Sequence, residues 1–160
     1  MEIRKLTADD SAGLAAFYAS LSDEVNWFYR PFDDPTEEVL REHLAGGDAG
    51  RHVILGIVDD DGSIAGHAFI LSVASEGPVF GIGLHQSIHG KGLGRRLTVA
   101  ILEEAGRLAL PLVTLTVMKE NVRAKTLYQS LGFELRGECG FRSPGDSLYM
   151  ERLAPGPHRT

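Results

Sequence analysis

The sequence predicts a single α/β domain in which about seven strands form one central sheet and about four helices cover it. Three observations predict this class. An apolar segment at 79–84, typical of a strand buried on both faces, runs into a glycine-rich turn and then into an amphipathic helix. Upstream, two apolar segments are joined by a turn of the hairpin type. Downstream, strand patterns flank a further helix pattern, and the 43% hydrophobic content of the 160 residues is enough for one core.

The chain begins with a strand, followed by two helices. Residues 2–6 alternate as in a strand, and Thr7 with the two aspartates after it gives a helix-start signal. The apolar face of this helix continues to Leu21. Thr36 caps the second helix and has two glutamates after it, and we expect the glycine pair 46–47 to end that helix.

A β-hairpin is expected next. Segments 52–58 and 63–73 have strand patterns and are joined by Asp59-Asp60-Asp61-Gly62. A calcium loop is the alternative for this acidic run. It is excluded because the twelfth position of such a loop falls on Ile70, where a bidentate Glu is required. The run is therefore interpreted as a turn.

The turn after the strand at 79–84 has the chemistry of an anion site. It reads His89-Gly90-Lys91-Gly92-Leu93-Gly94, and its three glycines let backbone N–H groups converge on a ligand. The next helix directs its free N–H groups and positive dipole end into the turn. Lys91, Arg95 and Arg96 add positive charge to a chain whose net charge is −6. The spacing fits neither the P-loop nor the dinucleotide pattern. The apolar stripe of this helix consists of Leu93, Leu97, Ile101, Ala105 and Leu108.

The rest of the chain completes the sheet. Segment 112–117 alternates between bulky apolar residues and Thr as a strand, and 121–131 forms a helix that Gly132 closes. Segments 133–138 and 147–153 are expected to pair as the last two strands.

Composition excludes several classes of protein. Residues 1–153 are expected to form the one domain, and 154–160 a flexible C-terminal tail. The single Cys139 can form neither an internal disulfide nor a thiolate metal cluster. The acidic charge balance without a basic stripe argues against nucleic acid as a partner. No apolar run reaches the ~18 residues of a membrane helix, and the N-terminus lacks a signal-peptide core. We therefore expect a soluble, cytoplasmic protein.

A second motif lies about 30 residues beyond the glycine turn. It contains Asn121, Ala124, Tyr128, Gly132 and Phe133, and the seven-residue spacing puts Asn121 and Tyr128 on one helix face. The two motifs together resemble those of the GNAT superfamily of acyl-CoA-dependent N-acetyltransferases. That family's turn reads Gln/Arg-x-x-Gly-x-Gly/Ala, and its later motif reads roughly Asn-x-x-Ala-x-x-x-Tyr-x-x-x-Gly-Phe. At position 89 this chain has His in place of Gln or Arg. The resemblance extends over about 1–153 and is strongest from 79 to 133.

The resemblance implies a GNAT-like mixed central sheet and acetyl-CoA as the co-substrate. The glycine turn would hold the pyrophosphate, and the backbone of Ile82, Gly83 and Leu84 would bind the pantetheine arm and polarise the thioester carbonyl. Asn121 would contact the cofactor, and Tyr128 would protonate the leaving thiolate. The turn residues implied in cofactor binding are His89, Gly90, Lys91, Gly92, Leu93, Gly94 and Arg95.

The resemblance also implies that the segment between the first two helices lines the acceptor side. In this chain the segment holds four aromatic residues within seven positions. Pro31 and Pro35 keep it from continuing as a helix. The aromatic side chains form either an apolar acceptor pocket or an edge of the core. They are Trp27, Phe28, Tyr29 and Phe32.

The general base has several candidates in the sequence. Some members of the family carry a catalytic Glu where this chain has Thr116. His85, at the end of a strand, is the candidate base, with Glu120 and Glu24 as alternatives and a structural, hydrogen-bonded role for His85 left open. His85 and His89 do not share a helix face and have no evident third ligand, so no metal is expected.

The sequence therefore favours an N-acetyltransferase that moves an acetyl group from acetyl-CoA to a primary amine by direct attack in a ternary complex. The amine is a small molecule or a protein N-terminus. Two alternatives stay open: a non-catalytic acyl-CoA-binding module, and a nucleotide-phosphate binder that uses the same turn. Members of the family are often dimers, so the resemblance also implies a homodimer.

Overall fold

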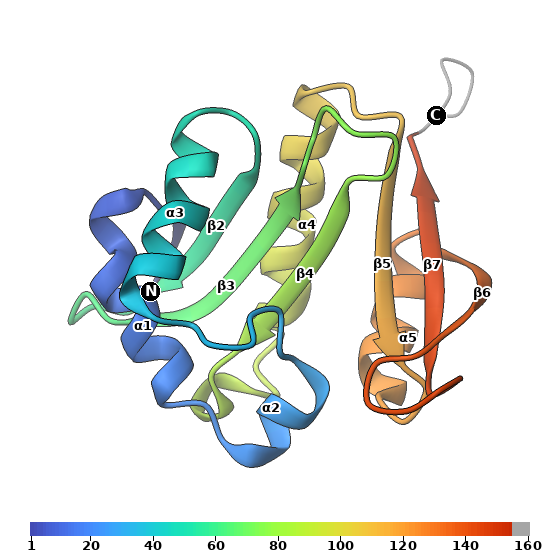
Figure 1. Ribbon diagram of the computed structural model, residues 1–160, viewed down its shortest axis with the longest axis horizontal. Coiled ribbons are helices and arrows are strands. Elements are labelled where there is room, and N and C mark those ends of the chain that lie inside the picture. The colour runs from blue at the N-terminus through green and yellow to red at the C-terminus, as the bar shows by residue number, and fades with distance from the viewer. Residues whose placement is uncertain (155–160) are drawn as a thin grey trace.

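The computed structural model describes residues 1–154, which form one seven-stranded sheet with helices on both faces (Figure 1). The strands are β1 (Glu2–Lys5), β2 (Val53–Val58), β3 (Ile64–Leu71), β4 (Val79–Leu84), β5 (Leu112–Met118), β6 (Glu134–Cys139) and β7 (Ser147–Leu153). Their order is β1-β2-β3-β4-β5-β7-β6. The predicted α/β class, mixed sheet and strands are confirmed, with β7 inserted between β5 and β6.

The sheet divides between β4 and β5. The other neighbouring strands pair antiparallel over several residues, whereas these two run parallel and pair only at Val79 and Thr114. From that pair the strands diverge toward the end of β4 (Figure 1). Within the described residues, this edge of β4 has no strand partner beyond Val79. Its backbone groups there are therefore available to a ligand.

Two hydrophobic cores lie on the two faces of the sheet. On one face, α1 (Ser11–Ala19) and α3 (Glu37–Asp48) bury Leu14, Phe17 and Leu40 against β2 and β3. On the other face, α4 (Leu93–Arg107) and α5 (Val122–Ser130) bury Leu97, Ile101 and other apolar side chains (Figure 1). Short pieces complete the fold: α2 (Asp23–Phe28) and the 3₁₀ turns η1 (Ala8–Asp10) and η2 (Gln86–Ile88).

The prediction that the glycine pair ends the second helix is wrong. Helix α3 continues through Gly46 and Gly47 to Asp48, and both glycines are buried. A Cβ at Gly46 would lie 2.5 Å from the ring of His52, and one at Gly47 would lie 3.0 Å from Ile54. The glycines therefore allow α3 to pack closely on the start of β2.

The structure also has one α-helix more than the four expected. This helix is α2, which Ser22 caps by accepting a hydrogen bond from the Val25 N–H. It contains Trp27 and ends at Phe28, before Pro31. The aromatic segment is thus partly helical.

Two glycine positions expected from the sequence are confirmed. Gly62 closes the acidic hairpin turn with a φ of 86°, and Gly132 follows α5 with a φ of 97°, both in the region that favours glycine. Of the expected C-terminal tail, residues 155–160 lie outside the described residues, and the N–H of Ala154 donates to the carbonyl of Pro111. Among the helices of residues 1–154, none combines the length and the apolar character needed to cross a membrane.

Candidate active site

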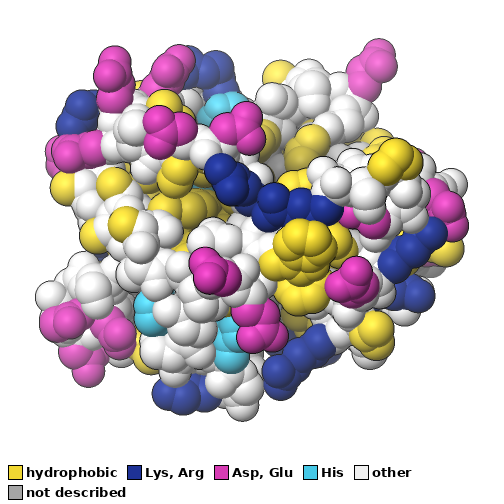
Figure 2. Space-filling model, turned by 60° about the horizontal axis from the view of Figure 1, so that its bottom comes forward, with side chains coloured by type: hydrophobic (Ala, Val, Ile, Leu, Met, Phe, Trp, Pro, Cys, Tyr) yellow, Lys and Arg dark blue, Asp and Glu magenta, His cyan; other side chains and the backbone are white. Residues whose placement is uncertain are grey.

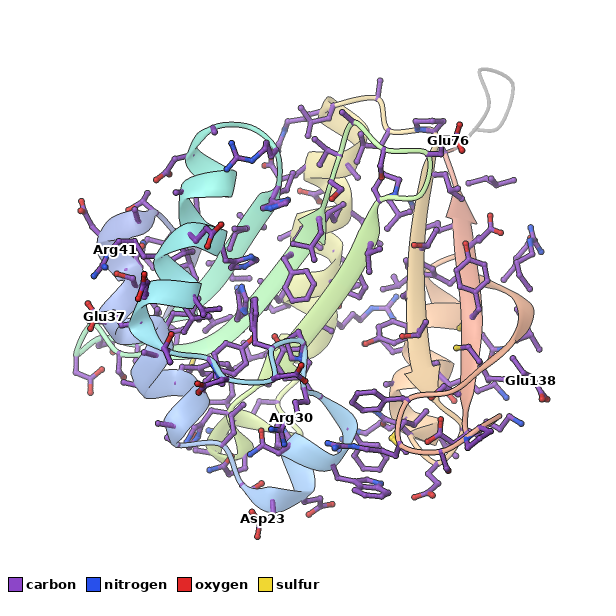
Figure 3. All side chains as sticks on the ribbon, in the orientation of Figure 1. Asp23, Arg30, Glu37, Arg41, Glu76 and Glu138 are labelled. Atoms are coloured by element: carbon purple, nitrogen blue, oxygen red, sulfur yellow. The ribbon has the colours of Figure 1, made fainter. Side chains whose placement is uncertain are left out.

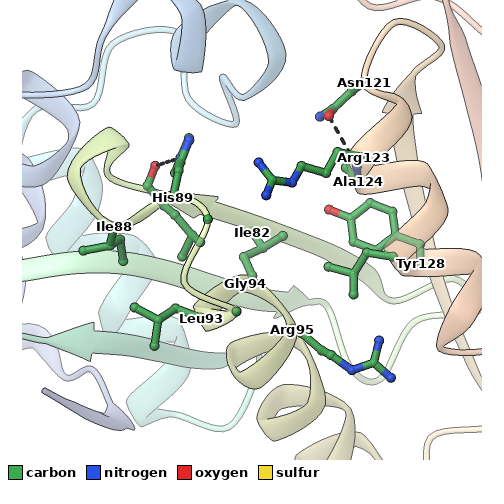
Figure 4. Close-up of a pocket in the computed structure, with 14 residues that line it drawn as sticks. Ile82, Ile88, His89, Leu93, Gly94, Arg95, Asn121, Arg123, Ala124 and Tyr128 are labelled. Carbon is green, nitrogen blue, oxygen red and sulfur yellow. Dashed lines mark hydrogen bonds between the residues drawn. The ribbon is translucent and has the colours of Figure 1, made fainter.

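A cavity of about 340 Å³ opens where β4 leaves β5. We call it the α4–α5 pocket. Ile82 and Leu84 of β4, the glycine turn, and side chains of α5 that include Arg123 and Tyr128 line it (Figure 4). The structure thus brings the two sequence motifs together around one cavity, although they are about 30 residues apart in the chain.

The glycine turn presents free backbone donors to this pocket. Gly90 and Gly92 have φ values of 78° and 76°, and Gly92 is the N-cap residue of α4. The N–H groups of Leu93, Gly94 and Arg95 have no hydrogen-bond partner within residues 1–154. An anion placed there would satisfy these donors and meet the positive end of the helix dipole.

Positive side chains surround the same turn. Arg95 and Arg123 line the pocket, and Arg95 also donates a hydrogen bond to the Ser130 hydroxyl at 3.1 Å, which connects α4 to α5. Lys91 is exposed beside the turn and is not among the lining residues. His89 points back to β4, where its Nε2 is 3.0 Å from the Leu84 carbonyl oxygen (Figure 4).

Tyr128 of α5 presents a polar group to this pocket. Its ring packs edge-on against Phe80 and Phe133, and its hydroxyl points into the pocket (Figure 4). Within the described residues the hydroxyl has no hydrogen-bond partner, and burial raises the pKa of Tyr128. The phenol therefore holds its proton at neutral pH and can donate it to a ligand. Asn121 lines the pocket as well, but its side-chain oxygen caps α5 by accepting from the Ala124 N–H at 3.4 Å.

Two further cavities lie beside the same stretch of β4. The first, of about 500 Å³, lies between α2 and the end of β4, and we call it the α2 groove. It shares Ile82, Leu84 and Asn121 with the α4–α5 pocket, so the two cavities adjoin. The second, of about 250 Å³, lies between the aromatic segment and β5, and we call it the β5 pocket. Phe28 and Tyr29 line both the α2 groove and the β5 pocket.

The four predicted aromatic residues therefore divide between two roles. Phe28 and Tyr29 line the cavities, whereas Phe32 packs edge-on against Tyr18 in the core beneath α1 and α3. Trp27 is 45% exposed and lines none of these three cavities. The core interpretation is confirmed for Phe32, whereas the acceptor role of Phe28 and Tyr29 stays a prediction.

Sequence analysis missed Arg142, which fastens the β6–β7 loop to α2. Its guanidinium lies 5.2 Å from the Trp27 ring centroid and 4.7 Å from that of Phe141. It also donates to the carbonyl oxygens of Asn26 and Trp27. Figure 2 shows this end of the molecule, where exposed hydrophobic side chains lie beside Lys and Arg. A single Arg in a loop carries no sequence signal for such a contact.

Asp146 organises that loop. Desolvation opposes its charge, but the backbone N–H groups of Phe141, Ser143 and Arg142 donate to the carboxylate and lower the pKa of Asp146 to about 2. The Asp146 carboxylate therefore stays ionised around neutral pH and keeps its hydrogen bonds to the loop that holds Arg142.

The predicted base candidates lie in different places. His85 lines a separate depression beside α1, and its Nδ1 accepts from the Ser87 N–H at 3.1 Å. Glu24 and Glu120 line the α2 groove, and Thr116 lines the β5 pocket. The structure thus brings the two glutamates to the α2 groove and leaves His85 outside it. No group of three metal-ligating side chains occurs within residues 1–154.

A buried polar network next to these cavities was also missed. It joins Tyr29 to Tyr18 of α1, His67 of β3 and His43 of α3. Three of the residues come from three separate elements, and Tyr29 directly follows α2. No spacing in the sequence indicates that they meet.

A model of the acetyltransferase (GNAT) family matches residues 17–133, which span both motifs and most of the described chain. This chain belongs to that family. The mycothiol acetyltransferase of Renibacterium salmoninarum is 39% identical to it over 69 residues, which are 43% of this chain and 19% of that protein. The chain thus spans about a fifth of the length of the curated relatives it matches first.

Solved structures of GNAT proteins share the fold over nearly the full chain. The ribosomal-protein-S5-alanine acetyltransferase from Vibrio fischeri superposes with a TM-score of 0.79 at 16% identity, covering 94% of this chain and 91% of its own. The PaiA N-acetyltransferase from Thermoplasma acidophilum, solved in complex with coenzyme A, gives 0.78 at 16% identity, covering 96% and 98%. At 16% identity, the likeness to these two structures shows only that this chain shares their fold.

Proposed function

We propose that this GNAT family member transfers an acetyl group from acetyl-CoA to a primary amine by direct attack in a ternary complex. The observation that carries the proposal is that the α4–α5 pocket and the α2 groove adjoin at Ile82 and Leu84, beside the unpaired edge of β4. A thioester bound in the first cavity and an amine bound in the second would therefore meet at one stretch of backbone.

The positive charge and free backbone groups of the α4–α5 pocket support coenzyme A as its ligand. The free N–H groups at the start of α4, with Arg95 and Arg123, suit a pyrophosphate. The free edge of β4 suits the amide groups of a pantetheine arm, because it offers unpaired backbone donors and acceptors. The coenzyme A complex of the PaiA protein, which has the same fold, supports this assignment.

The chain's own residues then divide the reaction between them. Acetyl-CoA supplies a thioester, whose carbonyl carbon forms a bond to the amine nitrogen as the carbon–sulfur bond breaks. A backbone N–H at the free edge of β4 stabilises the negative charge that develops on the carbonyl oxygen. Tyr128 gives its hydroxyl proton to the departing thiolate, a role that its free hydroxyl and raised pKa suit.

Direct attack is favoured over a cysteine-bound acetyl intermediate. Burial and the nearby Asp146 raise the pKa of the Cys139 thiol, so the nucleophilic thiolate is scarce. Cys139 also lines none of the α4–α5 pocket, the α2 groove and the β5 pocket.

The α2 groove favours a cationic amine. Glu24 and Glu120 line it together with Phe28, which combines negative charge with an apolar surface, and Arg123 lines it where it adjoins the α4–α5 pocket. The Vibrio fischeri neighbour is named for an alanine of a ribosomal protein, and this supports inclusion of protein N-termini among the acceptors to be tried.

Amine-dependent release of thiol from acetyl-CoA tests the function. The purified chain is incubated with acetyl-CoA and with spermidine, kanamycin, free amino acids or a peptide that begins with alanine. We expect one amine class to stimulate thiol release, and mass spectrometry should show that amine to be 42 Da heavier, the mass of an acetyl group in place of a hydrogen. Coenzyme A binding without stimulated release by any amine would favour an acyl-CoA-binding module instead. Displacement of coenzyme A by ATP would favour a nucleotide-phosphate binder.

A further inference from the structure

The proposed reaction needs a path for a proton that leaves the amine. An amine of pKa about 10.4 is only about 0.04% neutral at pH 7, whereas an α-amine of pKa about 7.8 is about 14% neutral. Both glutamates of the α2 groove are exposed and exchange protons directly with water, so neither belongs to a buried path. The buried network described above lies next to the same groove and has the continuity that such a path needs.

The network is continuous, and the Tyr29 hydroxyl also lies 3.2 Å from Nδ1 of His67. The hydroxyl oxygens of Tyr29 and Tyr18 are 2.5 Å apart, and the Tyr18 hydroxyl is 2.8 Å from Nδ1 of His67. On the other side of the His67 ring, Nε2 is 3.1 Å from Nε2 of His43. His67 is fully buried, and Tyr18 and His43 are also buried. Polar groups from α1, β3 and α3 are therefore joined to Tyr29 at the edge of a core that is otherwise apolar.

The first member of the chain lies at the proposed reaction site. The Tyr29 ring covers Gly83 of β4 so closely that a Cβ on Gly83 would lie 2.7 Å from Cζ, the ring carbon that carries the hydroxyl. Gly83 lies opposite His67 in the β3–β4 ladder, which explains how the Tyr29 hydroxyl reaches the histidine. Tyr29 and Gly83 both line the α2 groove.

The last member of the chain reaches solvent. Within residues 1–154, every buried side-chain nitrogen has a hydrogen-bond partner. Nδ1 of His43 has none in that range. This nitrogen is therefore not enclosed, and His43 as a whole is 8% exposed. The chain of hydrogen bonds thus runs from the α2 groove through the core to the outside.

We propose that Tyr29, Tyr18, His67 and His43 form a proton relay that carries a proton from the acceptor ammonium to solvent, in support of the proposed acetyl transfer. The ammonium N–H gives its proton to the Tyr29 oxygen, and Tyr29 passes its own proton to Tyr18. Tyr18 protonates Nδ1 of His67, whose Nε2 proton moves to Nε2 of His43. His43 releases its Nδ1 proton to water. Each member gains one proton and gives one, so none ends with a net charge, and the amine becomes neutral.

The surroundings keep the relay members neutral, as this mechanism requires. Desolvation lowers the pKa of His43 to about 4, assisted by the nearby His52, and desolvation also lowers the pKa of His67. Desolvation raises the pKa of both tyrosines. His52, itself beside Arg51, and Tyr128, which acts on Tyr29, are the other titratable groups that influence the network.

Charged residues of α3 lie away from the network. Glu37 and Arg41 project from the outer side of α3 and pair with each other at 2.8 Å (Figure 3). The inner side of the helix carries His43, whose ring packs edge-on against Phe32, His67 and Phe69.

Two substitutions interrupt the relay with little change of shape. Tyr29→Phe keeps the ring over Gly83 and removes the first hydroxyl. His43→Gln keeps an oxygen that can accept from His67 Nε2–H but cannot pass a proton onward. Tyr149→Phe is the control, because Tyr149 of β7 lies outside the network and lines none of the three cavities. For each protein, kcat/KM of thiol release is measured from pH 6 to pH 10.5 with the amine that stimulates it, together with coenzyme A affinity and thermal unfolding.

For an amine of pKa near 10, we expect each relay variant to lose at least about tenfold in kcat/KM at pH 7. The loss should shrink toward onefold as the pH approaches the amine pKa, because solvent then supplies the neutral amine. The control should match the wild type throughout. A loss of the same size at every pH, or no loss, would overturn the relay and leave the acetyltransferase proposal standing. Failure of the wild type to release thiol with any amine would instead contradict the acetyltransferase proposal.

A second measurement does not depend on activity. The relay requires His67 to carry its proton on Nε2 and to accept at Nδ1, a tautomer that ¹⁵N chemical shifts of the histidine rings can identify. We expect this tautomer in the folded chain between pH 6 and pH 8. A proton on Nδ1 of His67 would break the proposed direction of transfer and overturn the relay.

Discussion

Tyr128 shows how a single side chain is set up for proton donation. Its ring packs edge-on against Phe80 and Phe133 in the core. Its hydroxyl lies at the wall of the α4–α5 pocket and has no hydrogen-bond partner within the described residues. Most buried tyrosine hydroxyls find a protein partner, as Tyr18 and Tyr29 do here. An unmet donor that faces a cavity indicates a ligand that accepts from it.

Tyr128→Phe should therefore lower turnover without harming the fold. We expect kcat to fall by about tenfold to a thousandfold, the range for loss of an acid catalyst. Coenzyme A affinity and thermal stability should be nearly unchanged, because the hydroxyl makes no hydrogen bond within residues 1–154. Steady-state kinetics and calorimetry check both points. Full activity of the variant would assign proton delivery to another group.

At the scale of elements, the strand–turn–helix unit formed by β4, the glycine turn and α4 builds the cofactor side. Gly92 adopts a left-handed conformation at the N-cap position, which leaves the first N–H groups of α4 uncapped and turned toward the pocket. A side chain at Gly92 would meet no protein atom within 4 Å. Protein packing therefore does not restrict this position, whereas its positive φ does.

Gly92→Val should weaken coenzyme A binding by at least tenfold, because a branched side chain would obstruct the approach to the free N–H groups and is strained at positive φ. Gly62→Val is a matched control: Gly62 also has a positive φ and open space around it, but it lies in the β2–β3 turn. Isothermal titration calorimetry should show weak binding for the first variant and native affinity for the second, with similar losses of stability. Equal affinity in both would remove the turn from the cofactor site.

For the whole molecule, the two cores differ in their sensitivity to pH. The core beneath α1 and α3 contains His43 and His67, whose pKa values burial lowers, His43 to about 4, whereas an unfolded histidine has a pKa of about 6.5. Between these values the unfolded chain binds more protons than the folded chain. The stability that neutral burial provides is complete above pH 6.5 and is lost as the pH falls toward 4.

We expect the free energy of unfolding to fall by on the order of 1 to 2 kcal/mol per buried histidine between pH 7 and pH 5. Urea unfolding at the two pH values measures this change. His43→Gln cannot take up that proton, so its unfolding free energy should decline less over the same range. An identical decline in both proteins would show that His43 does not contribute.

The sequence by itself determined the seven strands, the glycine turn and the motif around Tyr128, because each of these is a local pattern of hydrophobic period, glycine or motif spacing. It did not determine the course of α3 through its two glycines, since contacts of that helix with His52 and Ile54 of another element decide it. The homodimer and the cytoplasmic location stay predictions. The predictable parts of the candidate site are those formed by residues close together in the sequence, namely the glycine turn and the motif around Tyr128.

Only the tertiary structure decided which side chains meet. Arg142 reaches α2 from a loop more than a hundred residues away, and the relay joins Tyr29, Tyr18, His67 and His43 from separate parts of the chain. Such contacts depend on how the helices pack on the two faces of the sheet and on where β4 and β5 diverge. Local sequence patterns record the period of each element but not the neighbours that packing gives it, so this part of the site emerged only with the fold.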